Sequence, residues 1–264
     1  GGFFKARPTD ASPVIRDVSK IRALVEAEVE AVDQVVDRAR GWARVVSPET
    51  SIKVGLTGID VSEETRLLDI IQPAPTREYL EEGDATVEGD PRALADNPRG
   101  AIVFAGQARR LGVRVGDPLT VIAETLQGQR NSEEVTVVAV ARDIGFMSNF
   151  SMFLSKATLR RLYRLGEDVS GVVQIYLEDY ERAPAVMRKL RARLEAEGFE
   201  LMPHEPSPFF AKFGTVSGEG WTGQRLDTTV WRDEVSFLGW ILTAVDTISF
   251  TLVATLLVII AIGI

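Results

Sequence analysis

Hydrophobic residues near the start of the chain follow a helical spacing. Between Val18 and Arg40 they recur mostly at steps of three and four, which places them on one face of a helix. The pattern predicts an amphipathic helix over residues 18–40. Asp17 or Ser19 is a suitable N-terminal cap, and Gly41 is a suitable end.

Shorter patterns follow. Residues 62–98 are rich in acids, Pro and Gly, which predicts loops with short elements. Around them, β-type runs and short helical runs alternate with turn residues. The predicted strands are 42–46, 51–59, 102–104, 119–124 and 134–141, the predicted short helices are 107–111 and 157–165, and the predicted hairpin tip is 127–132.

The last third of the polar part predicts a β–α–β unit. Gly171–Leu177 has strand composition, an amphipathic helix with Pro184 in its first turn follows, and Phe199–Met202 has strand composition again. Two parallel strands joined by a helix explain this order. We therefore predict an α+β fold. Residues 1–60 and 168–225 form one α/β sandwich lobe, residues 61–167 form an inserted, mainly β lobe, and residues 226–264 form a stalk and a truncated transmembrane helix.

The C-terminal stretch indicates a membrane protein. Thr247–Ile264 contains no charged residue, and a membrane helix needs about 20 predominantly apolar residues. A buried core helix is the alternative, although such a helix normally has a polar stripe. The residues before it show no excess of Lys or Arg, which favours a non-cytoplasmic location for the polar part.

Composition and missing motifs exclude several functions. The net charge is −8 and the sequence pI is about 5.0, so the chain lacks the basic surface of nucleic-acid binders. It has no Cys and one His, which excludes thiol catalysis and cysteine zinc sites. No phosphate-binding Gly-Lys-Ser/Thr motif occurs. We predict no catalytic, cofactor or metal site, and we interpret His204 as a loop residue.

A group of acids in the predicted loop region has no cation-binding spacing. We interpret it as a solvated acidic face. Its members are Glu63, Glu64, Glu81, Glu82 and Asp84.

Two surface segments are candidate interaction sites. Aromatic and Met side chains in loops form adaptable binding surfaces, although filling the core of the inserted lobe is the alternative. The candidate partner-binding residues are Gln127, Gln129, Arg130, Phe146, Met147 and Phe150. Aromatic residues near the predicted membrane helix suit the headgroup region or a neighbouring subunit, and core packing is equally open. The candidate membrane-interface residues are Phe209, Phe210, Phe213, Trp221, Trp231 and Trp240.

A series of motifs carries a family resemblance. Ala105–Asp117, with its Leu-Gly-Val-Arg-Val-Gly-Asp turn, leads into a β pair. In order, the further segments are Phe153–Leu162, Val173–Asp179, Trp231–Glu234 and Ile259–Ile264. Together they resemble the extracytoplasmic domain of MacB/LolC/FtsX-type ABC transporter permeases, from about residue 17 to the end. Residues 62–98 match no segment of that family, and residues 204–225 are longer than its usual connector.

The resemblance implies a function. In that family a two-lobed periplasmic domain, with porter and sabre lobes, lies between the first two transmembrane helices of an inner-membrane permease. ATP and Mg²⁺ bind to a separate ABC ATPase subunit, whose motion is relayed to the periplasm to extract or export a substrate such as a lipoprotein, lipid, peptide or toxin. The implied partners are that ATPase, a second permease copy or paralogue, a periplasmic adaptor or carrier protein, and membrane lipid. The alternative is a membrane-anchored extracytoplasmic sensor or ligand-binding domain.

Overall fold

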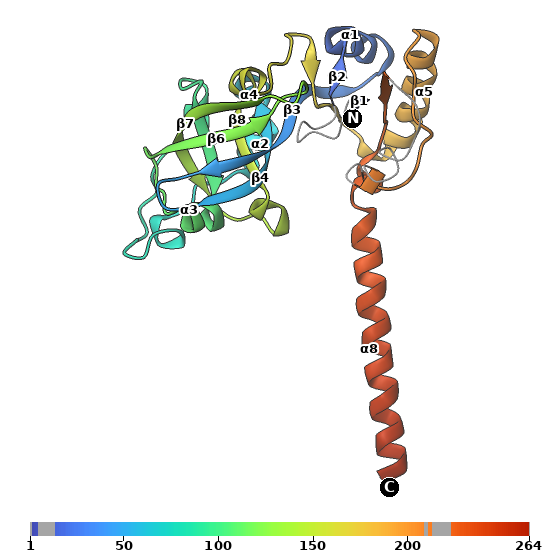
Figure 1. Ribbon diagram of the computed structural model, residues 1–264. Helices are drawn as coiled ribbons and strands as arrows, with labels where there is room; N and C mark the ends of the chain where they lie inside the picture. Colours follow the sequence, from blue (N-terminus) through green and yellow to red (C-terminus); the bar gives the residue numbers. More distant parts are fainter. Residues whose placement is uncertain (1, 5–13, 209–210, 213–222, 264) are drawn as a thin grey trace.

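The computed structural model describes residues 2–4, 14–208, 211–212 and 223–263. Its helices and strands form two lobes, and a long C-terminal helix extends away from them (Figure 1). The larger lobe is built on a mixed sheet, and the smaller lobe combines two helices with short strands. The predicted mixture of helices and strands is therefore confirmed.

Six strands of the larger lobe close into a ring in which each strand pairs with the next. In order around the ring they are β3 (Val32–Val46), β4 (Ser51–Ile59), β8 (Ser151–Ser155), β5 (Gly100–Phe104), β7 (Arg130–Ala141) and β6 (Pro118–Glu124), and β6 pairs with β3 again. The pairs β4–β8 and β5–β7 are parallel, and the others are antiparallel. Closure pairs backbone groups that an open sheet leaves at its edges.

The main hydrophobic core of the larger lobe combines side chains of the ring with two helices. Val121, Val137 and Leu154 are completely buried in it. Helix α3 (Ala105–Leu111) ends at Gly112, whose φ of 65° is left-handed as the predicted stop requires. Helix α4 (Lys156–Tyr163) contributes Leu159 to the same core.

A second layer lies against β5, β7 and β8. It buries Ile102, Phe104 and Phe153 together with Leu94 and Ile71. The covering segment holds the short elements η1 (Val61–Glu63), α2 (Thr65–Ile70), η2 (Thr76–Glu78) and η3 (Pro91–Leu94). The prediction of loops with short elements over residues 62–98 is confirmed.

The smaller lobe has its own core. Helices α1 (Val18–Glu28) and α5 (Ala183–Ala196) pack together, and Leu24, Val25 and Leu194 are buried between them and β10 (Val172–Leu177). β10 pairs antiparallel with the first half of β3. The remaining short elements are β1 (Gly2–Phe4), β2 (Ile15–Arg16), β9 (Val169–Ser170), η5 (Tyr180–Arg182) and β11 (Gln224–Leu226), of which β1 pairs with β11 and β2 with β9.

The predicted helix over residues 18–40 is wrong in its second half. The helix ends at Glu28, and residues 32–46 are one long strand. The spacing of Val32, Val35 and Val36 fits a helix, but β-branched side chains favour a strand. Pairing with β10 and β4 stabilises the strand and so overrides the helical spacing. At the helix start, Asp168 Oδ1 accepts a 2.7 Å hydrogen bond from Ser19 N, and the Asp17 side chain makes no cap bond.

Gly41 lies inside β3 and does not end a helix. A Cβ at this position would lie 2.2 Å from Cζ and Oη of Tyr163. The Tyr163 hydroxyl donates to the Trp42 carbonyl at 2.7 Å. This glycine is therefore required by the close approach of a buried ring, not by a helix end.

The predicted β–α–β unit does not form. β10 and α5 are present, but among the described residues the only strand partner of β10 is the antiparallel β3. Phe199–Met202 turns instead toward β11, where Leu201 forms an isolated parallel bridge with Leu226. Leu226 N donates to Glu200 O at 2.8 Å, and Met202 N donates to Leu226 O at 2.9 Å. These bonds take the segment away from β10.

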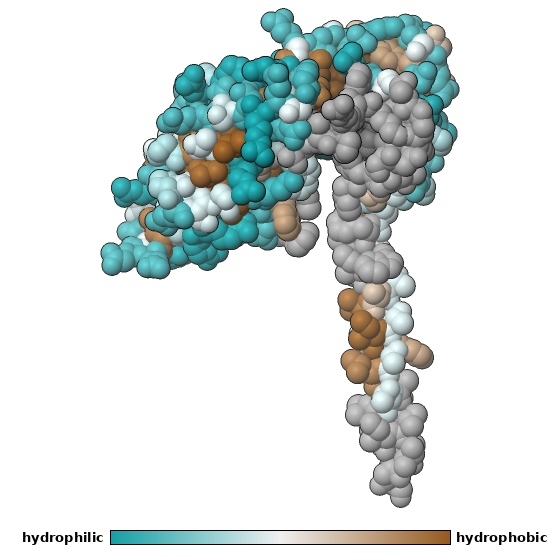
Figure 2. Space-filling model, in the orientation of Figure 1, coloured by the Kyte–Doolittle hydropathy of each residue, from teal (hydrophilic) through white to brown (hydrophobic). Residues whose placement is uncertain are grey.

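Two helices follow β11. The short α7 (Trp231–Glu234) precedes α8 (Ser236–Gly263), which has 28 residues and is about 42 Å long. α8 exposes apolar side chains, including Ile248 and Phe250, whereas the coloured part of the larger lobe on the face shown in Figure 2 is mostly hydrophilic. Within the part of the chain that the structure describes, we find no helix both long and apolar enough to cross a membrane.

The predicted limits of the lobes stay predictions. The limit at residue 60 follows β4, whereas Val54 of β4 packs in the larger core. Within β3, Val35 packs against the smaller core and Ala39 belongs to the larger one. One strand is thus shared by both lobes.

Candidate functional site: the junction between the lobes

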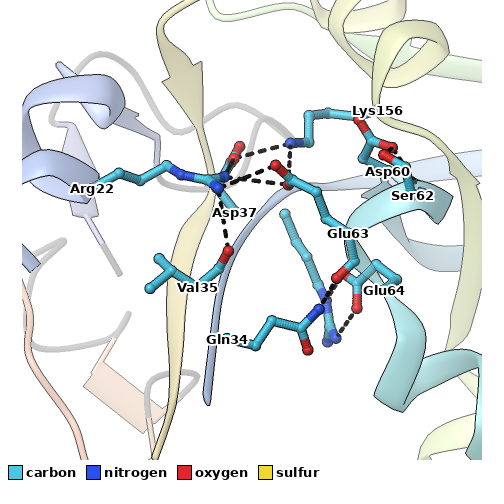
Figure 3. A network of polar contacts seen from close by, with 10 residues as sticks. Arg22, Gln34, Val35, Asp37, Asp60, Ser62, Glu63, Glu64 and Lys156 are labelled. Carbon is cyan, nitrogen blue, oxygen red and sulfur yellow. Dashed lines mark hydrogen bonds and ion pairs between the residues drawn. The ribbon is translucent and has the colours of Figure 1, made fainter. Parts of the chain in front are cut away.

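A network of charged side chains lies where the two lobes meet (Figure 3). Arg22 comes from α1, and Lys156 is the first residue of α4. Asp37 and Arg38 come from the shared strand β3, and Glu63 comes from η1. Elements distant in the sequence thus converge on one point.

Asp37 is the centre of the network. It is 5% exposed, and its Oδ1 accepts 2.9 Å hydrogen bonds from Arg22 Nη1 and from Lys156 Nζ. One cation belongs to a helix of the smaller lobe and the other to a helix of the larger lobe. A single buried carboxylate therefore ties the two lobes to β3.

Glu63 bridges the same two cations. Its Oε1 and Oε2 accept from Arg22 Nη2 at 3.1 Å and from Arg22 Nη1 at 3.2 Å, and Lys156 Nζ lies 3.6 Å from Oε2. Its backbone carbonyl also accepts a hydrogen bond from the Gln34 side chain. Each charge in this group faces charges of the opposite sign.

Arg38 and Glu64 form a second, deeper pair. Arg38 Nε and Nη2 donate to the two carboxylate oxygens of Glu64 at 2.5 and 2.6 Å, and Glu64 is 2% exposed. Arg38 Nη2 also donates to the Tyr176 hydroxyl of β10 at 3.2 Å. This two-point geometry fixes the relative orientation of the strand and the start of α2.

The network shifts the titration of its members. Burial alone would raise the pKa of Asp37, but the hydrogen bond and charge of Lys156, with that of Arg22, hold the pKa below its usual value. Burial alone would lower the pKa of Arg38, but Glu64 outweighs it and raises that pKa. The pKa of Arg22 is raised against burial by Glu63 and Asp37. All three side chains are thus held in their charged forms.

The arrangement of these charges is suited to holding the two lobes in a fixed relative position. The charges of Arg22, Arg38 and Lys156 balance those of Asp37, Glu63 and Glu64. Asp37, Arg38 and Glu64 are buried. Buried, mutually bonded ions are costly to separate, so the network resists a change in the angle between the lobes. Among the residues that the structure describes, no group of three or more acids or histidines is arranged to hold a metal ion.

The sequence interpretation missed this network. Glu63 and Glu64 were interpreted as part of a solvated acidic face, which is wrong for Glu64 because it is buried against Arg38. His204, which we interpret from the sequence as a loop residue, lies outside the helices and strands. Its Nε2 lies 3.0 Å from Asp233 Oδ2, which also accepts from Val230 N at 2.9 Å. Nothing near His204 in the sequence indicated this partner.

The predicted partner-binding residues lie in two separate places. Gln127, Gln129 and Arg130 are exposed at the turn between β6 and β7. Phe146 and Met147 belong to η4 (Phe146–Asn149), beyond the other end of β7. The twelve residues of β7 separate the two groups by about 40 Å, so they do not form one surface.

Individual members of this set have different surroundings. Gln129 Oε1 accepts a 2.6 Å hydrogen bond from Arg164. Phe150 is 40% exposed, and its backbone carbonyl accepts a hydrogen bond from Gly55 N at 2.6 Å. The partner-binding role of the set stays a prediction.

Of the predicted membrane-interface residues, Trp231 is placed most clearly. The residue is 46% exposed. Its ring meets that of Tyr180 edge-on with the centroids 5.8 Å apart, and the Arg232 guanidinium carbon lies 5.3 Å from the Trp231 ring centroid. Trp240 is in α8. The other four, Phe209, Phe210, Phe213 and Trp221, lie outside the described residues.

A cavity of about 950 Å³ lies in the smaller lobe. Its walls include β10, the apolar face of α5 and residues 226–230. Apolar side chains such as Ile175, Met187 and Leu190 form most of the lining. Burial lowers the pKa of Arg40 at this cavity, an effect that the charge of Glu234 opposes.

Comparison with known proteins gives matches among solved structures alone. No protein-family model and no curated protein matches the chain. The extracellular domain of the noncanonic ABC-type transporter YknZ from Gram-positive bacteria is similar at a TM-score of 0.44 and 16% identity, over 75% of this chain and 93% of that chain. The periplasmic region of MacB from Actinobacillus actinomycetemcomitans is similar at a TM-score of 0.43 and 13% identity, over 74% of this chain and 81% of that chain.

Proposed function

We propose that this chain is the extracytoplasmic domain of a non-catalytic ABC transporter permease of the MacB/LolC/FtsX type. The observation that carries the proposal is the order of its motifs and the structures they adopt. Ala105–Leu111 is a helix that ends at Gly112 and leads into the β6–β7 pair. Phe153–Leu162 spans β8 and α4, and Val173–Asp179 spans β10 and the turn toward α5.

The proposed mechanism relays motion and does not carry out chemistry. An ATPase subunit hydrolyses ATP in the cytoplasm, and α8 transmits the displacement to the smaller lobe. Because the junction network ties α1, β3 and α4 together, the larger lobe follows as one body. The substrate class is a lipoprotein, lipid, peptide or toxin handled on the outer side of the inner membrane.

Membrane attachment through α8 is part of the proposal. Thr247–Ile264 has no charged residue. The described side chains of Val245, Phe250 and Leu252 are more than half exposed, and apolar groups on an isolated helix need lipid or a neighbouring subunit to cover them.

The alternative, a ligand-binding sensor, requires a polar-lined pocket. The cavity beside β10 is lined mainly by apolar residues of the smaller core. This lining favours the permease over a sensor of small polar ligands.

Spin labels test the proposal in the full-length protein, copurified with its ATPase in lipid nanodiscs. The 264 residues given contain no cysteine. Once any cysteines elsewhere in the full-length protein and in the ATPase are replaced by serine, Ala185→Cys on exposed α5 gives one label per copy. We expect ATP with vanadate to shift the distance between the labels of two copies, relative to ADP. The control pair Glu82→Cys with Ala185→Cys spans the junction in one chain, and its distance should not change. Failure of an ABC ATPase to copurify, or identical inter-copy distances in both nucleotide states, contradicts the proposal.

A further inference from the structure

β10 is the edge strand of the seven-stranded sheet. β3 pairs with it on one side, and no other described strand lies on the other. An edge strand presents unpaired N–H and C=O groups, which form a template for another strand.

The backbone groups that face away from β3 can be identified. Glu178 N donates to Ala31 O of the turn before β3 at 3.2 Å. Because the register with β3 shifts between Tyr176 and Leu177, this bond assigns only Leu177 to the outward side.

Before the shift, Arg38 O faces β10 because it accepts a hydrogen bond from Gly171 N at 3.0 Å, and Arg38 pairs with Val172. Backbone groups alternate sides along a strand, so those of Val172 face β3 and those of Val173 and Ile175 point away from it. Outside the β10–β3 ladder, Val173, Ile175 and Leu177 have no backbone partner in the described part of the chain.

The edge carries little of the usual protection. Natural edge strands carry charges, Pro or bulges that prevent pairing. The sequence of β10, Val-Val-Gln-Ile-Tyr-Leu, has no charge and no Pro, and its pairing with β3 is irregular at one point, between Tyr176 and Leu177. All six of its residues are half-buried and line the 950 Å³ cavity. Gln174 Oε1 is buried there without a hydrogen-bond partner.

We propose that the free edge of β10 binds an extended segment of a partner polypeptide, which joins the sheet as an additional strand. The N–H and C=O groups of three β10 residues supply its hydrogen bonds. Val186 and Met187 of α5 form an apolar wall for every second side chain of the segment, and Gln174 suits a polar group. A lipid chain fills the apolar wall but leaves these backbone groups unpaired, so a polypeptide is the better occupant.

The probe is an eight-residue peptide of alternating Val and Thr with a Lys at each end, acetylated and amidated. Its binding to the chain is measured by fluorescence anisotropy. Two control peptides carry N-methyl groups on the odd or on the even residues, which removes the N–H donors of one edge. We expect at least one control to bind about a hundredfold more weakly, because three hydrogen bonds each contribute about a factor of five.

Amide hydrogen exchange locates the contact. The amides of Val173, Ile175 and Leu177 should exchange rapidly in the free chain and at least about tenfold more slowly with the peptide. Ile175→Pro removes one outward N–H and should abolish binding. The matched variant Ile175→Val retains that N–H and should bind as the parent does.

Three results overturn the proposal. They are equal binding of all three peptides, protection of the outward amides before any peptide is added, and no binding at millimolar peptide. If Ile175→Pro fails to fold, the methylated peptides and the exchange data still decide. None of these readouts depends on an ATPase, so they are independent of the permease proposal.

Discussion

The two lobes differ in whether their strands are paired on both sides. Every residue of β5 in the larger lobe is buried, whereas every residue of β10 in the smaller lobe is half-buried. The six strands of the ring have neighbours on both sides, whereas β10, the seventh strand of the same sheet, is paired with β3 alone among the described strands. A closed sheet suits a rigid body, and an open edge beside a cavity suits binding. The contrast indicates that the smaller lobe is the more adaptable of the two.

The largest expected effect comes from breaking the buried Arg38–Glu64 ion pair at the junction. Arg38→Met leaves the buried Glu64 carboxylate without its cation, and we expect a loss of about 4 kcal/mol in the free energy of unfolding. The double variant Arg38→Met with Glu64→Leu should recover most of it. Urea unfolding followed by tryptophan fluorescence measures both. Equal losses in the two variants contradict the assignment of the pair as a mutually compensated buried ion pair.

Truncating one leucine in each core sharpens the comparison. Leu159→Ala in the closed core should cost about 3 kcal/mol, because the ring cannot collapse into the space. Leu190→Ala borders the existing cavity and should cost about 2 kcal/mol, the lower end of the range for such truncations. The measurement is the same urea unfolding. A larger loss for Leu190→Ala shows that the smaller lobe is the better packed.

Gly41 tests how tightly the ring is filled. In Gly41→Ala the new Cβ displaces the Tyr163 ring and its hydrogen bond to Trp42, so we expect a loss of about 2 kcal/mol. Gly239→Ala in α8 is the matched control, because a Cβ there meets nothing within 4 Å. The control should be neutral or stabilising by up to about 1 kcal/mol. A thermal shift of the same size in both variants refutes the close-packing argument.

The smallest effect is a pH dependence at the junction. The pKa of Asp37 is lower in the folded chain than in the unfolded chain. Its contribution to stability is therefore present above the unfolded pKa and is lost as the pH falls through the folded pKa. Stability should fall more steeply with acid in the parent than in Asp37→Asn. Parallel curves of unfolding free energy against pH between 6 and 3, a range chosen to span ordinary carboxyl values, argue against this role.

Local signals explain what the sequence predicted correctly. The boundaries of β4, α3 and β6 follow from turn residues and alternation close to each element. The helix prediction is wrong for the first part of β3 because valines three and four residues apart fit a helix as well as a strand. The pairing of β3 with β10 involves residues more than 130 positions away, so no local pattern indicates it. The junction was missed for the same reason. The sequence around Arg22 and Lys156 does not distinguish them from ordinary surface residues. Only the folded chain brings both side chains into contact with Asp37.

The sharing of β3 has a consequence for protein engineering. Residues 32–38 pair with β10, and residues 39–46 pair with β4. Dividing the chain between complete strands does not separate the lobes, because both of them use β3. The lobes are therefore not independent modules that can be exchanged. A chimera that exchanges the larger lobe with that of a relative has to be joined within β3 itself, and its donor has to supply matching partners for both halves of one strand.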